Sequence, residues 1–211
     1  MFKKLVAVVA VAAVIAPVAA QAADHGFYVG ADAGAVWQDL GGRLEGLPIS
    51  PSALSHDQSP DVGWAAFGEI GTSLGSEFRI EGELGYRAST YSDVSHIDHL
   101  TVMANLLYEL PVGDDFSLSF GGGAGLDKIR WSGDGVSPVA GFSLSVDKDD
   151  WRFAAQGIVA ANLKLSDKLT ANLKYRYLFA PGGSSSSFSD DFLAADVSAQ
   201  TVSLGLTLDL D

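Results

Sequence analysis

Few residues in this sequence are spaced as a catalytic or metal-binding group would need them. His96 and His99 are close together, but a separation of three residues along a strand puts them on opposite faces. Asp147, Asp149 and Asp150 offer oxygen atoms to Ca²⁺, but the ligand pattern of a calcium loop is incomplete. The sequence also has no phosphate-binding loop, nucleophile elbow or zinc-protease motif. We therefore expect no enzyme, no catalytic residue, no metal and no cofactor.

The charged residues carry a stronger signal, because many of them share one face of an alternating pattern. On that face six acids are matched by six bases, although the whole chain has a formal charge of −13. A further acid of the same parity, Asp209, is left out of this count because it would lie near the short-turn rim, where water can reach it. A closed interior needs such a balance, since buried charges are costly unless paired. Chance is the alternative explanation. We interpret the set as a charge network inside a barrel, formed by Asp32, Glu69, Arg79, Glu81, Glu83, Arg87, Glu109, Asp127, Arg152, Lys164, Lys174 and Arg176.

Long stretches of alternating apolar and polar residues would position these charges. The first runs from Phe27 to Trp37, with Phe27, Val29 and Ala31 on one face. Similar stretches cover roughly 62–73, 77–90, 98–110, 115–130, 151–165, 168–180 and 197–210. Most exceed the usual strand length of about 5–6 residues, and a tilted strand that crosses a bilayer needs about 9–11. The pattern predicts eight long strands and no helix of comparable length.

The connections between these stretches alternate in length. Short ones are expected at 74–76, 111–114 and 166–167, and long ones at roughly 38–61, 91–97, 131–150 and 181–196. The long segments are rich in Gly, Ser, Pro and Asp, which favour solvated irregular backbone. Short turns on one rim and long loops on the other are typical of a bacterial outer-membrane barrel.

Alternation alone does not say which face points inward, since a soluble barrel buries its apolar set. The aromatic residues decide in favour of a membrane barrel, because rings on the apolar face gather near the strand ends and would form two interfacial girdles. On the long-loop side these are Trp37, Trp64, Tyr86, Trp151, Phe153, Tyr177 and Phe179, and on the short-turn side Phe27, Phe78, Tyr108 and Phe116. The polar face mixes long charged residues with glycines, which predicts a filled interior without a wide channel.

The first residues read as an export signal. Lys3 and Lys4 precede an apolar run over residues 5–20, and a small-x-small site ends at Ala22. We expect residues 1–22 to be a signal peptide and residues 23–211 to be the barrel domain. Removal of Lys3 and Lys4 leaves 11 basic and 26 acidic residues, a charge of −15. Such a charge argues against a nucleic-acid partner, which would need a basic face.

Several segments resemble the small outer-membrane β-barrel family that includes opacity-type and OmpA-like barrels, within the wider porin family. They are the opening segment Gly26-Phe27-Tyr28-Val29-Gly30-Ala31, the segment from Met103 to Pro111, the Gly-rich run from Phe120 to Gly125, and Gln156, Ser166 and Tyr175-Arg176-Tyr177. The resemblance implies an all-β, eight-stranded antiparallel up-and-down transmembrane barrel in a Gram-negative outer membrane. It also implies contact with the barrel-assembly machinery during insertion. Members usually end in an aromatic residue, whereas this chain ends in Asp211.

Lys128 and Arg130 are candidate contacts for lipopolysaccharide. In the alternating pattern they fall on the same outward face as the apolar residues of the segment 116–126. Phe116 and Lys128 are 12 steps apart. With a rise of about 3.3 Å per residue and a strand tilt of about 40°, these 12 steps span roughly 30 Å along the membrane normal. That span equals the thickness of the hydrocarbon layer. Both cations would then lie at the phosphates of the far head-group layer. The alternative to phosphate binding is that the two basic side chains only extend into water at the rim of the barrel.

We expect a structural or surface-interaction protein of the outer membrane, with its long loops outside and a plugged polar interior. Its partners would be outer-membrane lipid and lipopolysaccharide, and the loops could bind an extracellular partner. A narrow porin for small solutes is the alternative. A soluble periplasmic ligand-binding barrel is a third, weaker hypothesis.

Overall fold

A computed structural model describes residues 26–41, 62–75, 77–90, 95–136, 143–181 and 196–210. Side chains are described throughout these ranges except at 39–41, 95–97, 131–136 and 143–150. The expected signal peptide at 1–22 lies outside the described residues, so its cleavage stays a prediction. Among the residues described, no helix is long and apolar enough to span a membrane.

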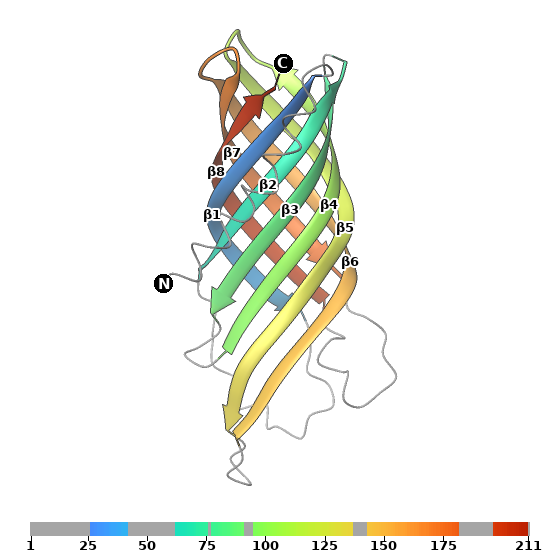
Figure 1. Cartoon of the computed structure of the whole chain (residues 1–211), viewed down its shortest axis with the longest axis vertical. Helices are drawn as coiled ribbons and strands as arrows, with labels where there is room; N and C mark the ends of the chain where they lie inside the picture. The colour runs from blue at the N-terminus through green and yellow to red at the C-terminus, as the bar shows by residue number, and fades with distance from the viewer. Residues whose placement is uncertain are drawn as a thin grey trace.

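Eight antiparallel strands form a closed barrel in which each strand pairs with its neighbours in the sequence (Figure 1). The strands are β1 (Phe27–Gly41), β2 (Gly63–Leu74), β3 (Phe78–Thr90), β4 (Ser95–Pro111), β5 (Phe116–Val136), β6 (Ser143–Lys164), β7 (Leu169–Ala180) and β8 (Asp196–Asp209). The barrel closes where β1 meets β8, from the pair Tyr28 and Asp209 to the pair Gly41 and Asp196. The eight-stranded up-and-down barrel predicted from alternation is confirmed.

The expected long loops are partly strand, most of all the segment 131–150. The region 131–150 was expected to be irregular, but β5 and β6 continue as a paired ladder as far as Val136 and Ser143. Figure 1 shows this hairpin extending past the ends of the other strands. The strand β4 likewise begins at Ser95, inside the expected loop 91–97. The residues of this region favour turns, so the sequence did not predict strands here. Backbone pairing with the neighbouring strand overrides such weak local preferences.

The short connections close with few residues. In the turn between β2 and β3, Gly75 has a φ of +82°, a left-handed conformation that glycine adopts without steric cost. Between β4 and β5, the amides of Val112 and Gly113 both donate to the carbonyl of Phe116. All three short turns lie at the same end of the barrel, and β1, β3, β5 and β7 end at the other (Figure 1).

Side-chain burial alternates along the strands with the predicted parity. On β4, Leu106 is 51% exposed, whereas its neighbours Asn105 and Leu107 are each 2% exposed. The same alternation runs through β7, where Tyr175 and Tyr177 face out and Arg176 faces in. The barrel therefore shows an apolar surface and encloses a largely polar interior, the reverse of a soluble barrel.

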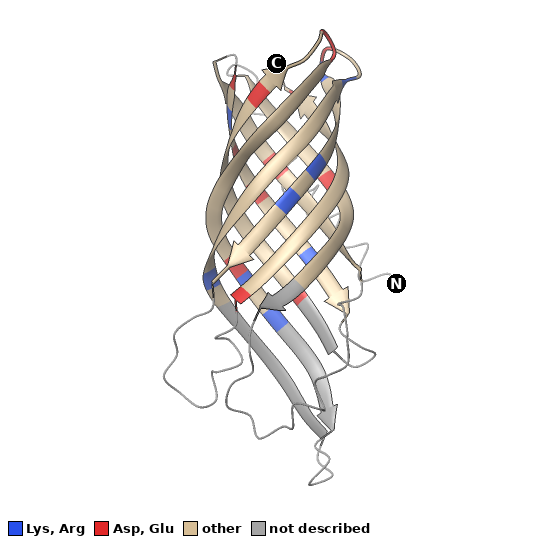
Figure 2. Cartoon of the chain, turned by 180° about the vertical axis from the view of Figure 1, so that it is seen from behind, with Lys and Arg blue, Asp and Glu red and all other residues tan. Residues whose placement is uncertain are grey.

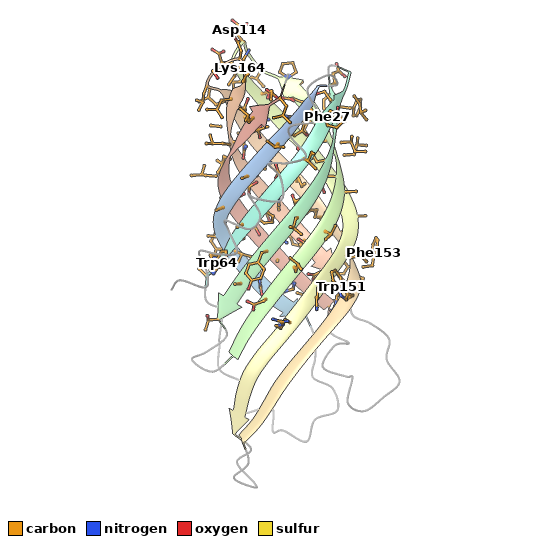
Figure 3. The ribbon with its side chains drawn as sticks, in the orientation of Figure 1. Phe27, Trp64, Asp114, Trp151, Phe153 and Lys164 are labelled. Carbon is orange, nitrogen blue, oxygen red and sulfur yellow. The ribbon has the colours of Figure 1, made fainter. Side chains whose placement is uncertain are left out.

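Aromatic rings gather near both ends of the outer surface. At the short-turn end, the ring centroids of Phe78 and Tyr108 are 5.3 Å apart, and those of Tyr108 and Phe120 are 5.2 Å apart. At the other end, the rings of Trp64 and Tyr86 lie 5.4 Å apart. Figure 3 shows Phe27 near the first end and Trp64, Trp151 and Phe153 in the other half. Aliphatic and small residues lie between these two belts, as expected for a surface that meets lipid.

Leu106→Arg should destabilise the barrel far more than Leu110→Arg. Both leucines face outward on β4 with similar exposure, 51% and 43%, but Leu106 lies between the two aromatic belts and Leu110 lies at the rim. Arg near the middle of a bilayer costs about 2–4 kcal/mol, and about 0–1 kcal/mol near its interface. Urea unfolding of the protein in lipid vesicles measures both. Equal losses would contradict the outward assignment or the membrane position.

Candidate functional site in the barrel interior

Arg176 on β7 is the best-connected side chain of the interior. It is fully buried, and its guanidinium donates five hydrogen bonds to side chains of β1, β2, β3 and β8. Nη1 and Nη2 reach the two oxygens of Asp32 at 3.0 and 2.8 Å, and Nη2 also reaches Oε1 of Glu69 at 2.5 Å. Nε donates to Oε2 of Glu83 at 3.0 Å. An arginine side chain has five N–H groups, so its hydrogen-bonding capacity is fully used.

The acids around Arg176 would repel one another without it. Glu69 on β2 stands directly opposite Glu83 on β3 in the strand register, and like charges in that position are destabilising. Lys174, also on β7, adds a second cation: its Nζ contacts Oε2 of Glu69 and lies 3.7 Å from Oδ2 of Asp32. We call Asp32, Glu69, Glu83, Lys174 and Arg176 the Arg176 cluster. It joins one wall of the barrel to the other.

Amide side chains extend the cluster toward β4 and β6. Nε2 of Gln156 donates to Oε1 of Glu83 at 3.1 Å and to Oδ1 of Asn105 at 2.8 Å. On the short-turn side, the hydroxyl of Tyr28 donates to Oε1 of Glu81 at 2.8 Å. The hydrogen bonds therefore cross the interior at more than one height. Figure 2 shows basic and acidic segments together on the strands in the middle of the barrel, away from both rims.

Glycines make room for the large interior side chains. A Cβ atom at Gly71 would collide with the ring of Tyr28, and one at Gly85 would collide with the ring of Phe67. Phe67 is fully buried, with the guanidinium carbons of Arg176 and Arg87 at 4.0 and 4.7 Å from its ring centroid. Each cation is thus held against an aromatic face, an interaction that strengthens when water is excluded.

A second charged group lies nearer the long loops. Nδ1 of His99 on β4 is 2.8 Å from Oδ2 of Asp127 on β5, and both side chains are fully buried. Arg87 on β3 donates to the hydroxyls of Thr101 and Thr201, at 3.0 and 3.5 Å. Arg152 stands opposite Asp127 in the β5–β6 register. An apolar cluster that includes Val36, Phe67, Met103 and Leu178 lies among these charges.

The short-turn rim holds the remaining members of the predicted network. Nη2 of Arg79 is 2.9 Å from Oε2 of Glu109, and both side chains are partly exposed. Lys164 differs from the expectation of an interior residue. Its side chain is 46% exposed and pairs with Asp167 at 3.1 Å across the β6–β7 turn, because β6 ends at this residue and water reaches it. A hollow at this rim is lined by Glu109, Asp114, Lys164 and Asp167 among others. Figure 3 shows Asp114 and Lys164 at this end of the barrel.

The structure brings together eleven of the twelve charged residues predicted to face inward, in groups rather than in one network. They are the Arg176 cluster; Glu81 with Tyr28; the His99–Asp127 pair near Arg87 and Arg152; and the Arg79–Glu109 pair. Three uncharged residues matter that the charge pattern does not single out, namely Tyr28, Phe67 and Asn105. The sequence placed these three residues on the inward face of their strands. That position alone does not say whether a side chain bonds to the charged residues or only fills space.

Of the residues considered for chemistry, only His99 has a described side chain, and it pairs with Asp127. Ser89 is an inward hydroxyl on the strand next to His99, but Oγ of Ser89 and Nε2 of His99 each lack a hydrogen-bond partner, so they do not bond to each other. Among the described residues, no cluster of three metal-binding side chains is found. The side chains of His96, Asp147, Asp149 and Asp150 lie outside the described part.

Lys128 and Arg130 both lie on the outer face of β5 in the half near the long loops. Lys128 is opposite Trp151 in the β5–β6 register, and its Nζ lies 5.9 Å from the centroid of that indole. Arg130 is exposed. Trp151, itself 50% exposed, belongs to the aromatic belt of this half. The two cations therefore stand where the outer aromatic belt ends.

Comparison with known proteins identifies a family model and distant relatives. Residues 6–209 match the model described as the outer membrane protein beta-barrel domain. An uncharacterized protein of Brucella abortus is 32% identical over 99 residues, which cover 44% of this chain and 34% of that protein. A protein of Brucella suis matches to the same extent. The chain thus spans about a third of the length of these curated relatives.

Solved structures share the fold at low sequence identity. Neisserial surface protein A has a TM-score of 0.60 and 13% identity, with 87% of this chain and 96% of that chain covered. The outer membrane protein OprG from Pseudomonas aeruginosa has a TM-score of 0.51 and 12% identity, with coverages of 88% and 96%. These likenesses show a common barrel architecture.

Glu83→Ala should lower the free energy of unfolding much more than Glu77→Ala. Glu83 is 2% exposed and accepts hydrogen bonds from Arg176 and Gln156, and removal of one partner of a buried ion pair costs about 3–5 kcal/mol. Glu77 is exposed in the β2–β3 turn. Thermal and urea unfolding in detergent micelles measure the difference. Matching stabilities of the two variants would contradict the role of Glu83.

Proposed function

Because the chain belongs to the outer membrane protein beta-barrel domain family, we propose that its barrel is a closed membrane anchor that presents the long loops at the cell surface. The single observation that supports a closed interior is the Arg176 cluster, whose hydrogen bonds cross the lumen from β7 to β1, β2 and β3. A solute would have to break several charge-assisted hydrogen bonds, which are stronger than neutral ones. We therefore assign the barrel a structural or surface-interaction role.

The surface role of this proposal rests on the asymmetry of the barrel. Three short turns join the strands at one end, whereas at the other end the connecting segments are long in sequence and the β5–β6 hairpin is extended. In outer-membrane barrels the long loops face outside. An extracellular partner would therefore bind these loops. Export by the leader at residues 1–22 and insertion by the barrel-assembly machinery complete the proposal.

A narrow porin is the second candidate, since polar side chains line much of the interior. Planar-bilayer recording at single-channel resolution separates the two functions. We expect no stepwise conductance from the purified, refolded protein. Steps of reproducible size that change in a Lys174→Gln variant would contradict a closed interior and support the porin. Lys174 is suited to this test because it is 5% exposed and projects from β7 into the lumen, so a current through lipid defects would not respond to it.

We propose further that Lys128 and Arg130 bind lipopolysaccharide phosphates at the outer head-group layer. Both belong to the outward face of β5, and Trp151 beside Lys128 is a residue type that settles at the interface. Arginine can hold phosphate with two parallel hydrogen bonds, and lysine acts as a point charge.

Lys128→Gln combined with Arg130→Gln should weaken the binding of lipopolysaccharide, while refolding into zwitterionic lipid stays unchanged. The matched control is Lys164→Gln with Lys168→Gln, which removes two exposed cations at the opposite rim. Co-sedimentation with lipopolysaccharide-containing vesicles measures both pairs of changes. Lipopolysaccharide binding that is the same for the parent and the first double variant would overturn the contact.

A further inference from the structure

Apolar side chains from six strands pack together inside the barrel. They belong to β1, β2, β4, β6, β7 and β8, and none is more than 2% exposed. Their side chains carry no nitrogen or oxygen atom that could hydrogen-bond to water. One member from each strand defines what we call the apolar layer: Val36, Phe67, Met103, Ala154, Leu178 and Ala199. The lumen is therefore not polar along its whole length.

The apolar layer follows the Arg176 cluster in the direction of the long loops. Phe67 is the next inward residue after Glu69 on β2, and Leu178 is the next inward residue after Arg176 on β7. The buried His99–Asp127 pair lies farther toward the long loops. The layer therefore separates the ion pairs of the cluster from the charged side chains at that end.

Glycines of β3 and β5 lie against the apolar layer. A Cβ atom on Gly85 of β3 would be 2.8 Å from Cδ1 of Phe67, and one on Gly125 of β5 would be 2.9 Å from Sδ of Met103. These distances are too short for a real Cβ atom, so both side chains already touch the backbone of the glycine strands. All eight strands thus border the layer, as expected for a barrel just wide enough to be filled by side chains.

Phe67 links the apolar layer to the charged groups on either side. The guanidinium carbon of Arg176 is 4.0 Å from the centroid of its ring, and that of Arg87 is 4.7 Å away. Arg87 is held by the hydroxyls of Thr101 and Thr201, and Arg176 by carboxylates. The ring therefore occupies space between two anchored cations. Without it, the gap would be bordered by charged groups that attract water.

An ion would meet different obstacles in the two parts of the lumen. Rings of charged side chains line ion-conducting pores, whereas a hydrophobic constriction stops ions because it excludes water. Transfer of an ion into surroundings without a polar partner is very costly. The Arg176 cluster obstructs larger solutes, and the apolar layer is the stronger barrier to water and small ions.

We propose that the apolar layer is the ion seal of the barrel, and that the chain becomes an ion-conducting pore when a polar group replaces Phe67 or Leu178. This inference rests on the proposed function as a closed anchor and names the residues that close it to ions. It also explains how a barrel with so many polar interior side chains stays closed.

Single-channel recording of refolded variants in planar bilayers tests the seal. Phe67→Ser and Leu178→Ser each place a hydroxyl group in the apolar layer, and we expect stepwise conductance of reproducible size from both. Phe67→Leu keeps the layer apolar and should stay silent. The matched control is Leu107→Ser, which makes the same exchange at an inward leucine of β4 that is 2% exposed and lies in the half near the short turns. It should also stay silent.

The outcomes separate the ion seal from the closed anchor. Silence of both serine variants of the layer, in protein that circular dichroism shows to be refolded, would overturn the seal and leave the closed anchor standing. Steps of the same size from Leu107→Ser would also overturn the seal, because any loss of packing would then open the lumen. Steps from the parent would contradict the closed anchor and the seal together. Phe67 and Leu178 belong to different strands, so either variant decides the test if the other does not refold.

Discussion

The barrel can close around its interior only if the buried acids are neutralised, and Arg176 does most of this. Its five hydrogen bonds reach Asp32, Glu69, Glu83 and Ser203 on four other strands. Glu69 and Glu83 oppose each other in register, so the β2–β3 pairing brings together two like charges. A planar fork of donors fits several carboxylates at once, whereas a lysine would act as a single point charge.

The rest of the architecture follows from that interior. An eight-stranded barrel is just wide enough to be filled by side chains, so glycines such as Gly71 and Gly85 must lie beside the large rings of Tyr28 and Phe67. Because the polar set faces inward, the apolar set faces outward and meets lipid. The aromatic belts then fix the height of the barrel in the membrane, with the long loops and the β5–β6 hairpin on one side.

Alternation was sufficient to predict the eight strands, since a period of two is unambiguous over a dozen residues. The choice of the inward face needed a second signal, the aromatic residues near the strand ends. The extension of the β5–β6 hairpin could not be predicted, because its residues favour turns. Its strand structure comes from backbone pairing between the two strands, which the local sequence does not reveal. The inward charges were visible as a set, but their partners were not: which acid meets Arg176 depends on strand stagger around the barrel. Lys164 shares the parity of the set and yet lies in water, because parity says nothing about depth.

A double-mutant cycle between Arg176 and Asp32 tests the central claim most directly. Free energies of unfolding in micelles would be compared for the parent, Arg176→Met, Asp32→Asn and the combined variant. The bidentate contact between these residues predicts that Arg176→Met costs less when Asp32 is already uncharged, with an interaction energy of about 0.5–3 kcal/mol. Additive losses, within about 0.5 kcal/mol, would contradict the view that Arg176 neutralises the acids of the interior.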